Sequence, residues 1–332
     1  MEPFLSLLSC QPGSTKQNGL SEALAAAIEN GPLPPGTPLP SVNRLSQAQG
    51  VSRDTVFKAY RRLKQRGLVG STPAKGYFVQ QPVCRVLVVL DHYSSFKDTF
   101  YNALVEHTRH LPVSMDLLFH YYNPEIFASR IEESLAKYNL FVLMNHQSGA
   151  LHPVLRKMDP SKVMMIDWGD LPKSPFSYVA QDYSGGFITA LEEALPDLLR
   201  YKQLYYVQPA GNFHPESSRK VFGEFCRKHR LPWKFLSSLT PADVEPGNAY
   251  LIIPHETIIE AVKICRSKNL TIGSEVGLLA VNDTPLFEVM GPGINAISAN
   301  FEAMGVAAAQ FVQTRGQICQ TVPTRYLRRQ SL

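Results

Sequence analysis

Basic side chains are concentrated at one end of this 332-residue chain, where they could bind a polyanion. Residues 1–82 contain nine Lys and Arg against four Asp and Glu, whereas residues 83–332 contain 24 of each. The whole formal net charge of +5 therefore lies in the first quarter of the sequence. This distribution predicts a small module that binds a negatively charged partner, joined to an electrically neutral body.

Side chains with reactive groups form no recognisable catalytic or metal-binding motif. The segment His255–Ile259 lacks the second histidine of a zinc protease helix, and the chain contains no P-loop and no G-x-S-x-G elbow. The five cysteines are scattered, at least 39 residues apart, which favours a reducing cytoplasm over a disulfide framework. An apolar stretch ending at Cys10 is too short, and lacks the preceding basic residues, for an export signal. We expect no enzyme activity, no catalytic residue, no metal and no cofactor.

Residues 16–80 contain the pattern of three helices and a hairpin. Leu20, Leu24 and Ile28 share one face of a first helix, which ends near Asn30-Gly31. Ser41 can cap a second helix and Ser52 a third. Two short strands, 68–70 and 76–79, follow the glycine that ends the third helix. This order predicts a winged helix-turn-helix.

The same residues resemble the DNA-binding domain of GntR-type transcription regulators. The resemblance rests on Pro35-Gly36-Thr37-Pro38-Leu39-Pro40-Ser41, Val51-Ser52-Arg53-Asp54-Thr55-Val56, Gly67-Leu68-Val69 and Gly76-Tyr77-Phe78-Val79. Asn43 and Phe57 stand where the family often has Arg, so the operator sequence of other members does not carry over.

The resemblance implies that the third helix enters the major groove of DNA. Arg53 would then donate two bonds to a guanine, while helix N-termini and hydroxyl groups bind phosphates. The expected DNA-binding residues are Ser41, Asn43, Arg44, Ser52, Arg53, Asp54, Thr55, Lys58, Lys75 and Gly76.

Short apolar strands alternate with amphipathic helices through the rest of the chain. This alternation is typical of doubly wound parallel sheets, and the length favours two of them. We expect four segments: an N-terminal arm at residues 1–15, the winged helix-turn-helix at 16–80, a linker at 81–84, and an effector-binding and dimerisation domain at 85–332. Strands are expected at 85–90, 113–119, 140–144, 163–166, 204–207, 250–253, 276–280 and 319–326, and helices at 97–110, 124–138, after 182, and at 215–230, 256–268 and 300–314.

The body resembles the effector domain of LacI-type regulators, which has the fold of type I periplasmic binding proteins. The resemblance rests on residues 179–186, 272–286, 297–298, 304–308 and 322–331. It implies a small-molecule site between two lobes, at the carboxyl ends of the strands. Aromatic, amide and charged side chains there suit a sugar. The expected effector-binding residues are His92, Tyr93, Phe96, Asn145, Trp168, Phe213, Arg219, Lys220, His255, Asn282 and Asp283.

The two resemblances together predict a cytoplasmic, homodimeric transcription regulator that binds double-stranded operator DNA and a sugar or sugar derivative. A neutral sugar is slightly favoured because the body carries no net positive charge. We expect Asp283→Ala to abolish the effector response. Two alternatives stay open: a regulator whose effector site has degenerated, leaving a constitutive or partner-controlled protein, and a solute-binding protein. An aminotransferase-like body that binds pyridoxal phosphate, as some GntR-type regulators have, needs more than 250 residues.

Overall fold

A computed structural model describes residues 16–29, 33–73, 76–80, 83–145, 151–167, 174–209 and 214–332. The chain divides into two compact units. The first ends at Arg85 and includes Pro112–Ser114, and the second comprises Val86–Leu111 and Met115–Leu332. No helix within these described ranges is long and apolar enough to cross a membrane.

The first unit is a winged helix-turn-helix, as predicted. Its helices are α2 (Lys16–Glu29), α3 (Val42–Gln49) and α4 (Arg53–Gln65), and its antiparallel wing pairs β1 (Val69–Thr72) with β2 (Gly76–Val79). Leu24, Leu45 and Leu63 are fully buried between the helices. The helix α3 ends because Gly50 adopts a left-handed conformation with φ of 60°. A small apolar core thus holds α4 with its polar face outward.

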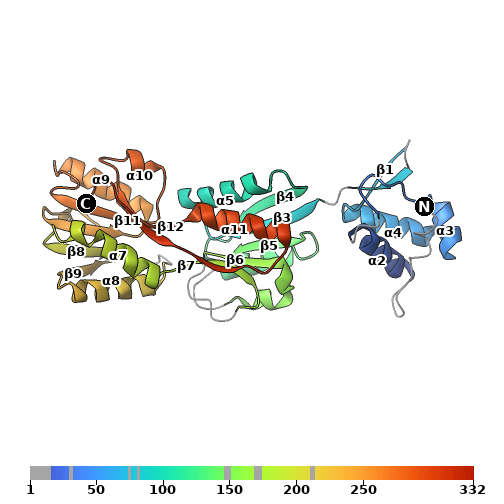
Figure 1. Ribbon diagram of the computed structural model, residues 1–332, viewed down its shortest axis with the longest axis horizontal. Helices are drawn as coiled ribbons and strands as arrows, with labels where there is room; N and C mark the ends of the chain where they lie inside the picture. Colours follow the sequence, from blue (N-terminus) through green and yellow to red (C-terminus); the bar gives the residue numbers. More distant parts are fainter. Residues whose placement is uncertain are drawn as a thin grey trace. The chain divides into compact units, whose positions relative to one another are not determined.

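The second unit contains two six-stranded sheets, one in each lobe (Figure 1). The first-lobe sheet has the order β13-β7-β6-β5-β3-β4 and the second-lobe sheet the order β14-β12-β11-β10-β8-β9. Every residue of β5, β10 and β11 is buried. Such continuously buried, mostly apolar strands are expected where helices cover both faces of a parallel sheet. The predicted pair of doubly wound sheets is therefore confirmed.

The first lobe is built from two stretches of the chain, residues 84–181 and 301–322. Its strands are β3 (Cys84–Leu90), β4 (Val113–Phe119), β5 (Leu140–Met144), β6 (Val163–Ile166), β7 (Ser177–Gln181) and β13 (Cys319–Val322). Its helices are α5 (Ser95–Thr108), α6 (Pro124–Glu132) and α11 (Phe301–Thr314), with the short turns η1 (Pro153–Lys157) and η2 (Pro160–Lys162). The helices α5 and α11 lie side by side (Figure 1).

The second lobe has the same alternation. Its strands are β8 (Gln203–Val207), β9 (Trp233–Leu236), β10 (Asn248–Ile252), β11 (Val276–Val281), β12 (Asn295–Ala299) and β14 (Thr324–Leu327). Its helices are α7 (Gly185–Leu198), α8 (Glu216–Lys228), α9 (His255–Ser267) and α10 (Leu286–Val289), with the turn η3 (Pro241–Asp243).

The strands β7, β9 and β12 were not predicted, and two predicted elements differ in extent. The predicted strand 319–326 is two strands, because Pro323 has no N–H and ends the ladder. Its halves pair in different sheets, β13 with β7 and antiparallel β14 with β12. The predicted helix 124–138 ends at Glu132, after which Ser134 and Lys137 form tight turns.

The chain passes between the lobes three times, from β7 to α7, from β12 to α11 and from β13 to β14 (Figure 1). At the first crossing the Asp182 carboxylate accepts hydrogen bonds from the backbone N–H groups of residues 184–186. At the third, Thr324 Oγ1 donates to the Asp182 carbonyl at 3.3 Å. Two of the crossings are therefore held together directly.

Candidate functional site

The helix α4 presents a polar N-terminal turn to solvent. Its cap, Ser52, accepts a hydrogen bond from the Thr55 N–H at 3.1 Å, and the two hydroxyls lie 2.8 Å apart. Arg53 is exposed and follows the cap directly. Ser41 caps α3 in the same way, through the Arg44 N–H at 3.3 Å. The caps fix where each helix begins and so where Arg53 and the exposed Asn43 and Arg44 are presented.

The basic side chains of α4 differ in their partners. Lys58 forms an exposed ion pair with Asp54 at 2.6 Å, one helical turn away. Arg62 and Arg66 both contact Glu22 of α2, so these two cations stabilise the domain internally. Gly76, at the start of the second wing strand, is exposed with φ of 67°, and the neighbouring Lys75 lies outside the described residues. Arg53, in contrast, lies exposed at the first position of α4.

The second unit contains a cavity of about 310 Å³ between the two lobes. It is bounded by residues that follow β3, β5 and β6 in the first lobe and β8, β10 and β11 in the second. Parallel strands bring their carboxyl ends to one edge, which is why these loops converge. The described lining comprises Asp91, His92, Tyr93, Ser94, Ser95, Phe96, Lys97, Tyr122, Met144, Asn145, Asp167, Tyr183, His214, Pro215, Ile253, Pro254, His255, Glu256, Ile259, Asn282, Thr284, Leu286 and Phe287.

Six of the residues predicted to bind an effector line this cavity. They are His92, Tyr93, Phe96, Asn145, His255 and Asn282. Trp168 and Phe213 lie outside the described residues. The cavity brings together side chains that are up to 190 positions apart in the sequence, as the strand-end argument requires.

The other three predicted residues do not belong to the described lining. Lys220 is exposed on α8, and Arg219 contacts Glu216 at 3.2 Å and lies over the Phe235 ring. Arg219 is thus paired within the second lobe, and Lys220 is exposed to solvent. Neither cation belongs to the described lining, so their predicted contact with an acidic ligand stays a prediction.

The third residue, Asp283, has its carboxylate paired within the protein. Its two carboxylate oxygens accept hydrogen bonds from Arg329 Nη1 and Nη2, each at 2.8 Å. Arg329 Nη1 also donates to the Ile294 carbonyl at 2.7 Å. This bidentate pair occupies the carboxylate and ties the C-terminal segment to the loop after β11.

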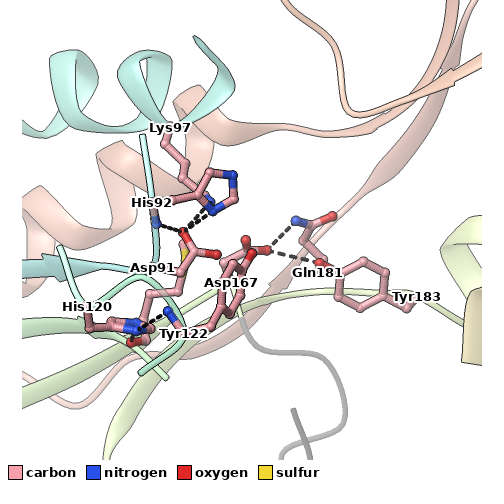
Figure 2. A network of polar contacts seen from close by, with 9 residues as sticks. Asp91, His92, Lys97, His120, Tyr122, Asp167, Gln181 and Tyr183 are labelled. Atoms are coloured by element: carbon pink, nitrogen blue, oxygen red, sulfur yellow. Dashed lines mark hydrogen bonds and ion pairs between the residues drawn. The ribbon is translucent and has the colours of Figure 1, made fainter. Parts of the chain in front are cut away.

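Two clusters of polar side chains contribute residues to the lining of the cavity, and Figure 2 shows their contacts. In the first, Asp91 Oδ1 accepts hydrogen bonds from the His92 backbone N–H and from Lys97 Nζ. In the second, Asp167 Oδ1 accepts from Gln181 Nε2 and, at 3.3 Å, from the Tyr183 hydroxyl. Two carboxylates from the ends of β3 and β6 thus reach the same cavity with different partners.

Burial and these partners shift the carboxylate pKa values in opposite directions. Burial alone would raise the pKa of Asp91, but His92 and Lys97 together lower it below its usual range. For Asp167, burial is the largest effect and raises its pKa to about 7, although Lys97 opposes it. Burial lowers the pKa of His214 to about 4 and also lowers that of His255, so both rings are neutral at pH 7.

Backbone strain coincides with the cavity. Tyr122, Asp167 and Asn282 all line it, with left-handed φ values of 58°, 53° and 64°. For an aromatic residue this conformation is unfavourable, and such outliers cluster at ligand sites. The Asn282 Oδ1 atom is buried and has no hydrogen-bond partner among the described residues. A ligand could supply that missing donor.

Asp91, Lys97, Tyr122 and Tyr183 are among the lining residues that were not predicted from the sequence. A signal existed for Asp91, because it directly follows the buried strand β3. None existed for Lys97, which lies on α5 and is buried by its pairing with Asp91. Tyr122 reaches the cavity from the turn after β4, at the edge of the sheet.

Comparison with known proteins identifies the first unit. Residues 16–79 match the family described as bacterial regulatory proteins, gntR family. The N-terminal domain is a GntR-type winged helix-turn-helix. This GntR-type domain is also 45% identical, over 67 residues, to the uncharacterized HTH-type transcriptional regulator YjiR of Escherichia coli (strain K12). That match covers 20% of this chain and 14% of YjiR, so the chain spans only a small part of that relative.

Solved structures show the fold that accompanies the GntR-type domain. The trehalose repressor of Escherichia coli has a TM-score of 0.62 at 15% identity, over 74% of this chain and 99% of that one. A LacI family regulator of Lactobacillus casei with bound glucose has a TM-score of 0.60 at 14% identity, over 75% and 100%. A periplasmic binding protein/LacI regulator of Alkaliphilus metalliredigens, complexed with D-xylulofuranose, scores 0.58 at 10% identity, over 74% and 98%. The two-lobed unit has the LacI-type effector-domain fold.

Proposed function

We propose that this protein is a DNA-binding transcription regulator whose operator affinity is controlled by a small effector bound between the two lobes. The observation that carries the proposal is a cavity lined by both lobes, in a chain that begins with a GntR-type DNA-binding domain. The regulator binds double-stranded operator DNA and therefore acts in the cytoplasm.

An effector in this cavity would contact both lobes and so favour one arrangement of them. Phe96 of the first lobe already contacts His255 of the second, with ring centroids 5.4 Å apart. Ligand binding can shift a conformational equilibrium only through such different contacts in the two states. A coupling of about 1–3 kcal/mol between effector and operator is typical.

The effector is a sugar or sugar derivative. Asn145 and Asn282 offer amide groups, and Tyr93, Phe96 and Tyr122 offer aromatic faces, which together suit hydroxyl groups and C–H surfaces. The similar Lactobacillus casei and Alkaliphilus metalliredigens structures hold glucose and D-xylulofuranose. The unpartnered Asn282 oxygen favours a working site over a degenerate one.

The active form is a homodimer on a palindromic operator. One winged helix contacts a short half-site, and two-fold symmetry doubles the contact area on DNA. Arg53, Asp54 and Thr55 are the proposed base-reading residues, with Ser41, Ser52 and Arg44 on phosphates and Asn43, Lys58, Lys75 and Gly76 as additional contacts.

The test measures the affinity of the full chain for operator DNA by fluorescence anisotropy. The operator is first selected from random DNA, and each sugar of a panel is then added to see whether the affinity changes. The change Asn282→Gly removes the amide and tolerates the left-handed backbone at this position. We expect it to abolish the effector response while leaving effector-free operator affinity unchanged. The control Lys220→Ala, exposed on α8, should respond like the unaltered protein. A normal response in Asn282→Gly would place the effector elsewhere.

A further inference from the structure

Asp167 is a cavity carboxylate without an opposite charge of its own. Its hydrogen-bond partners, Gln181 and Tyr183, are neutral and both bind Oδ1 (Figure 2). Within the described part of the chain no hydrogen bond to Oδ2 is found. Because Asp167 is only partly exposed, its charge is costly in the absence of a paired cation unless a proton or a ligand compensates it.

The nearby cation, Lys97, is paired with a different carboxylate. Lys97 forms an ion pair with Asp91, and the two side chains are only 4% and 9% exposed. Lys97 is also the only Lys or Arg among the described lining residues. Asp91, Lys97 and ionised Asp167 therefore leave one negative charge in the cavity, and the exposed Glu256 adds another at its rim.

Protonation compensates Asp167 when the cavity is empty. Because burial raises its pKa to about 7, the carboxyl group carries a proton for part of the time at neutral pH. An ammonium group beside Oδ2 could replace that proton and restore the ion pair that the protein itself does not provide.

The surroundings of Asp167 also suit a cation. Tyr122, Tyr183 and Phe96 line the cavity with it, and aromatic faces attract ammonium groups. Burial raises the pKa of both tyrosines, so their phenols stay neutral and keep oxygen acceptors available. An anionic ligand, by contrast, would be repelled by Asp167 and Glu256 and would have to break the Asp91–Lys97 pair.

We propose that the effector carries a protonated amine, as an amino sugar does, and that this amine binds Asp167. The inference rests on the proposed function, because it assigns the chemical class of the ligand in the same cavity. It replaces the neutral sugar favoured from net charge with a cationic derivative. Net charge describes the whole surface, whereas the ligand meets only the cavity.

Matched pairs of ligands test the proposal. The full chain is screened by thermal shift at pH 7, in a buffer without amines, against glucosamine and glucose, galactosamine and galactose, mannosamine and mannose, and 1,4-diaminobutane and 1,4-butanediol. Glucose 6-phosphate and gluconate form the anionic arm. We expect stabilisation mainly by amines, with the best amine binding at least about tenfold more tightly than its hydroxyl partner in calorimetry.

Two variants assign the effect to Asp167. Asp167→Asn keeps the oxygen that accepts from Gln181 and Tyr183 but removes the charge, and we expect it to lose the tenfold preference. Glu302→Gln, at an exposed position of α11, removes one charge from the same lobe and should retain it. In the unaltered protein, calorimetry in two buffers of different ionisation enthalpy should also show partial proton release on amine binding, which Asp167→Asn should lack.

Contrary outcomes separate the two proposals. Tighter binding of a neutral or anionic compound, no stabilisation by any amine, or an undiminished preference in folded Asp167→Asn would overturn the amine assignment. If such a neutral or anionic compound still changed operator affinity, and Asn282→Gly abolished that change, the proposed function would stand. If amines bind but none of them changes operator affinity, the proposed regulatory function is wrong, whereas the proposed amine-binding site is still supported.

Discussion

At the scale of single residues, identical side chains acquire different properties from their partners. Asp91 and Asp167 both follow buried first-lobe strands and both line the cavity. Asp91 is held ionised by Lys97 and His92, whereas Asp167 has only neutral donors and its pKa rises to about 7. Their positions in the sequence predict where they lie, but only the partners decide their charge.

The raised pKa of Asp167 predicts a pH-dependent stability. Between about pH 4 and 7 the folded protein binds this proton more tightly than the unfolded chain, so the free energy of unfolding falls as pH rises. The variant Asp167→Asn has no carboxyl group to titrate at this position, so its free energy of unfolding should not show this decrease. Denaturant unfolding without ligand should therefore show the variant gaining roughly 1–3 kcal/mol over the unaltered protein between pH 5 and 8. An equal difference at both pH values would mean that Asp167 titrates normally.

Arg53 predicts a sequence-specific effect on DNA binding. Its exposed position directly after the Ser52 cap suits a bidentate contact to guanine. Arg53→Ala should weaken operator binding by about 1–3 kcal/mol and relax one base preference in a selection experiment. Lys75→Ala should instead weaken binding to all sequences alike and reduce the salt dependence. An unchanged base preference in Arg53→Ala would remove this residue from base reading.

At the scale of elements, the C-terminal segment fastens the second lobe. Arg329 clamps Asp283, and the Ser331 hydroxyl donates to the Leu278 carbonyl at 2.6 Å. Arg328 contacts Asp197 of α7 at 2.9 Å. The segment after β14 therefore joins the loop after β11, the strand β11 and the helix α7.

The Asp283–Arg329 pair changes the effect expected of Asp283→Ala from a loss of effector response to a loss of stability. Arg329 and Asp283 are only 16% and 21% exposed, so breaking their pair should lower the free energy of unfolding by about 1–3 kcal/mol. Effector affinity of the folded variant should be unaltered. Thermal unfolding and calorimetry measure the two effects, and a double-mutant cycle with Arg329→Ala isolates the pair. A large loss of ligand affinity at unchanged stability would restore Asp283 as a ligand.

At the scale of the whole molecule, we expect the second unit to hold the proposed dimer together. The second unit is compact by itself and contains both lobes with their three crossings. We expect residues 83–332, expressed alone, to sediment as a dimer. A monomeric fragment at micromolar concentration, together with a dimeric full chain, would place the interface in the N-terminal domain.

The sequence by itself determined the local features of this protein. Ser41 and Ser52 cap helices, and apolar strands alternate with helices, because each of these features depends on neighbours along the chain. The same logic located His92, Asn145, His255 and Asn282 at strand ends, where parallel sheets bring loops together.

Tertiary structure alone decided which side chains meet. Arg329 pairs with Asp283, 46 positions away in the sequence, and Lys97 forms its ion pair with Asp91. The last predicted strand divides at Pro323, and its two halves belong to different sheets. No periodicity encodes such partners, since they depend on how distant elements pack. The charge of the cavity, and with it the class of ligand proposed, follows from those pairings. The sequence shows only an Asp at both positions, whereas the structure places one beside a cation and the other among neutral donors.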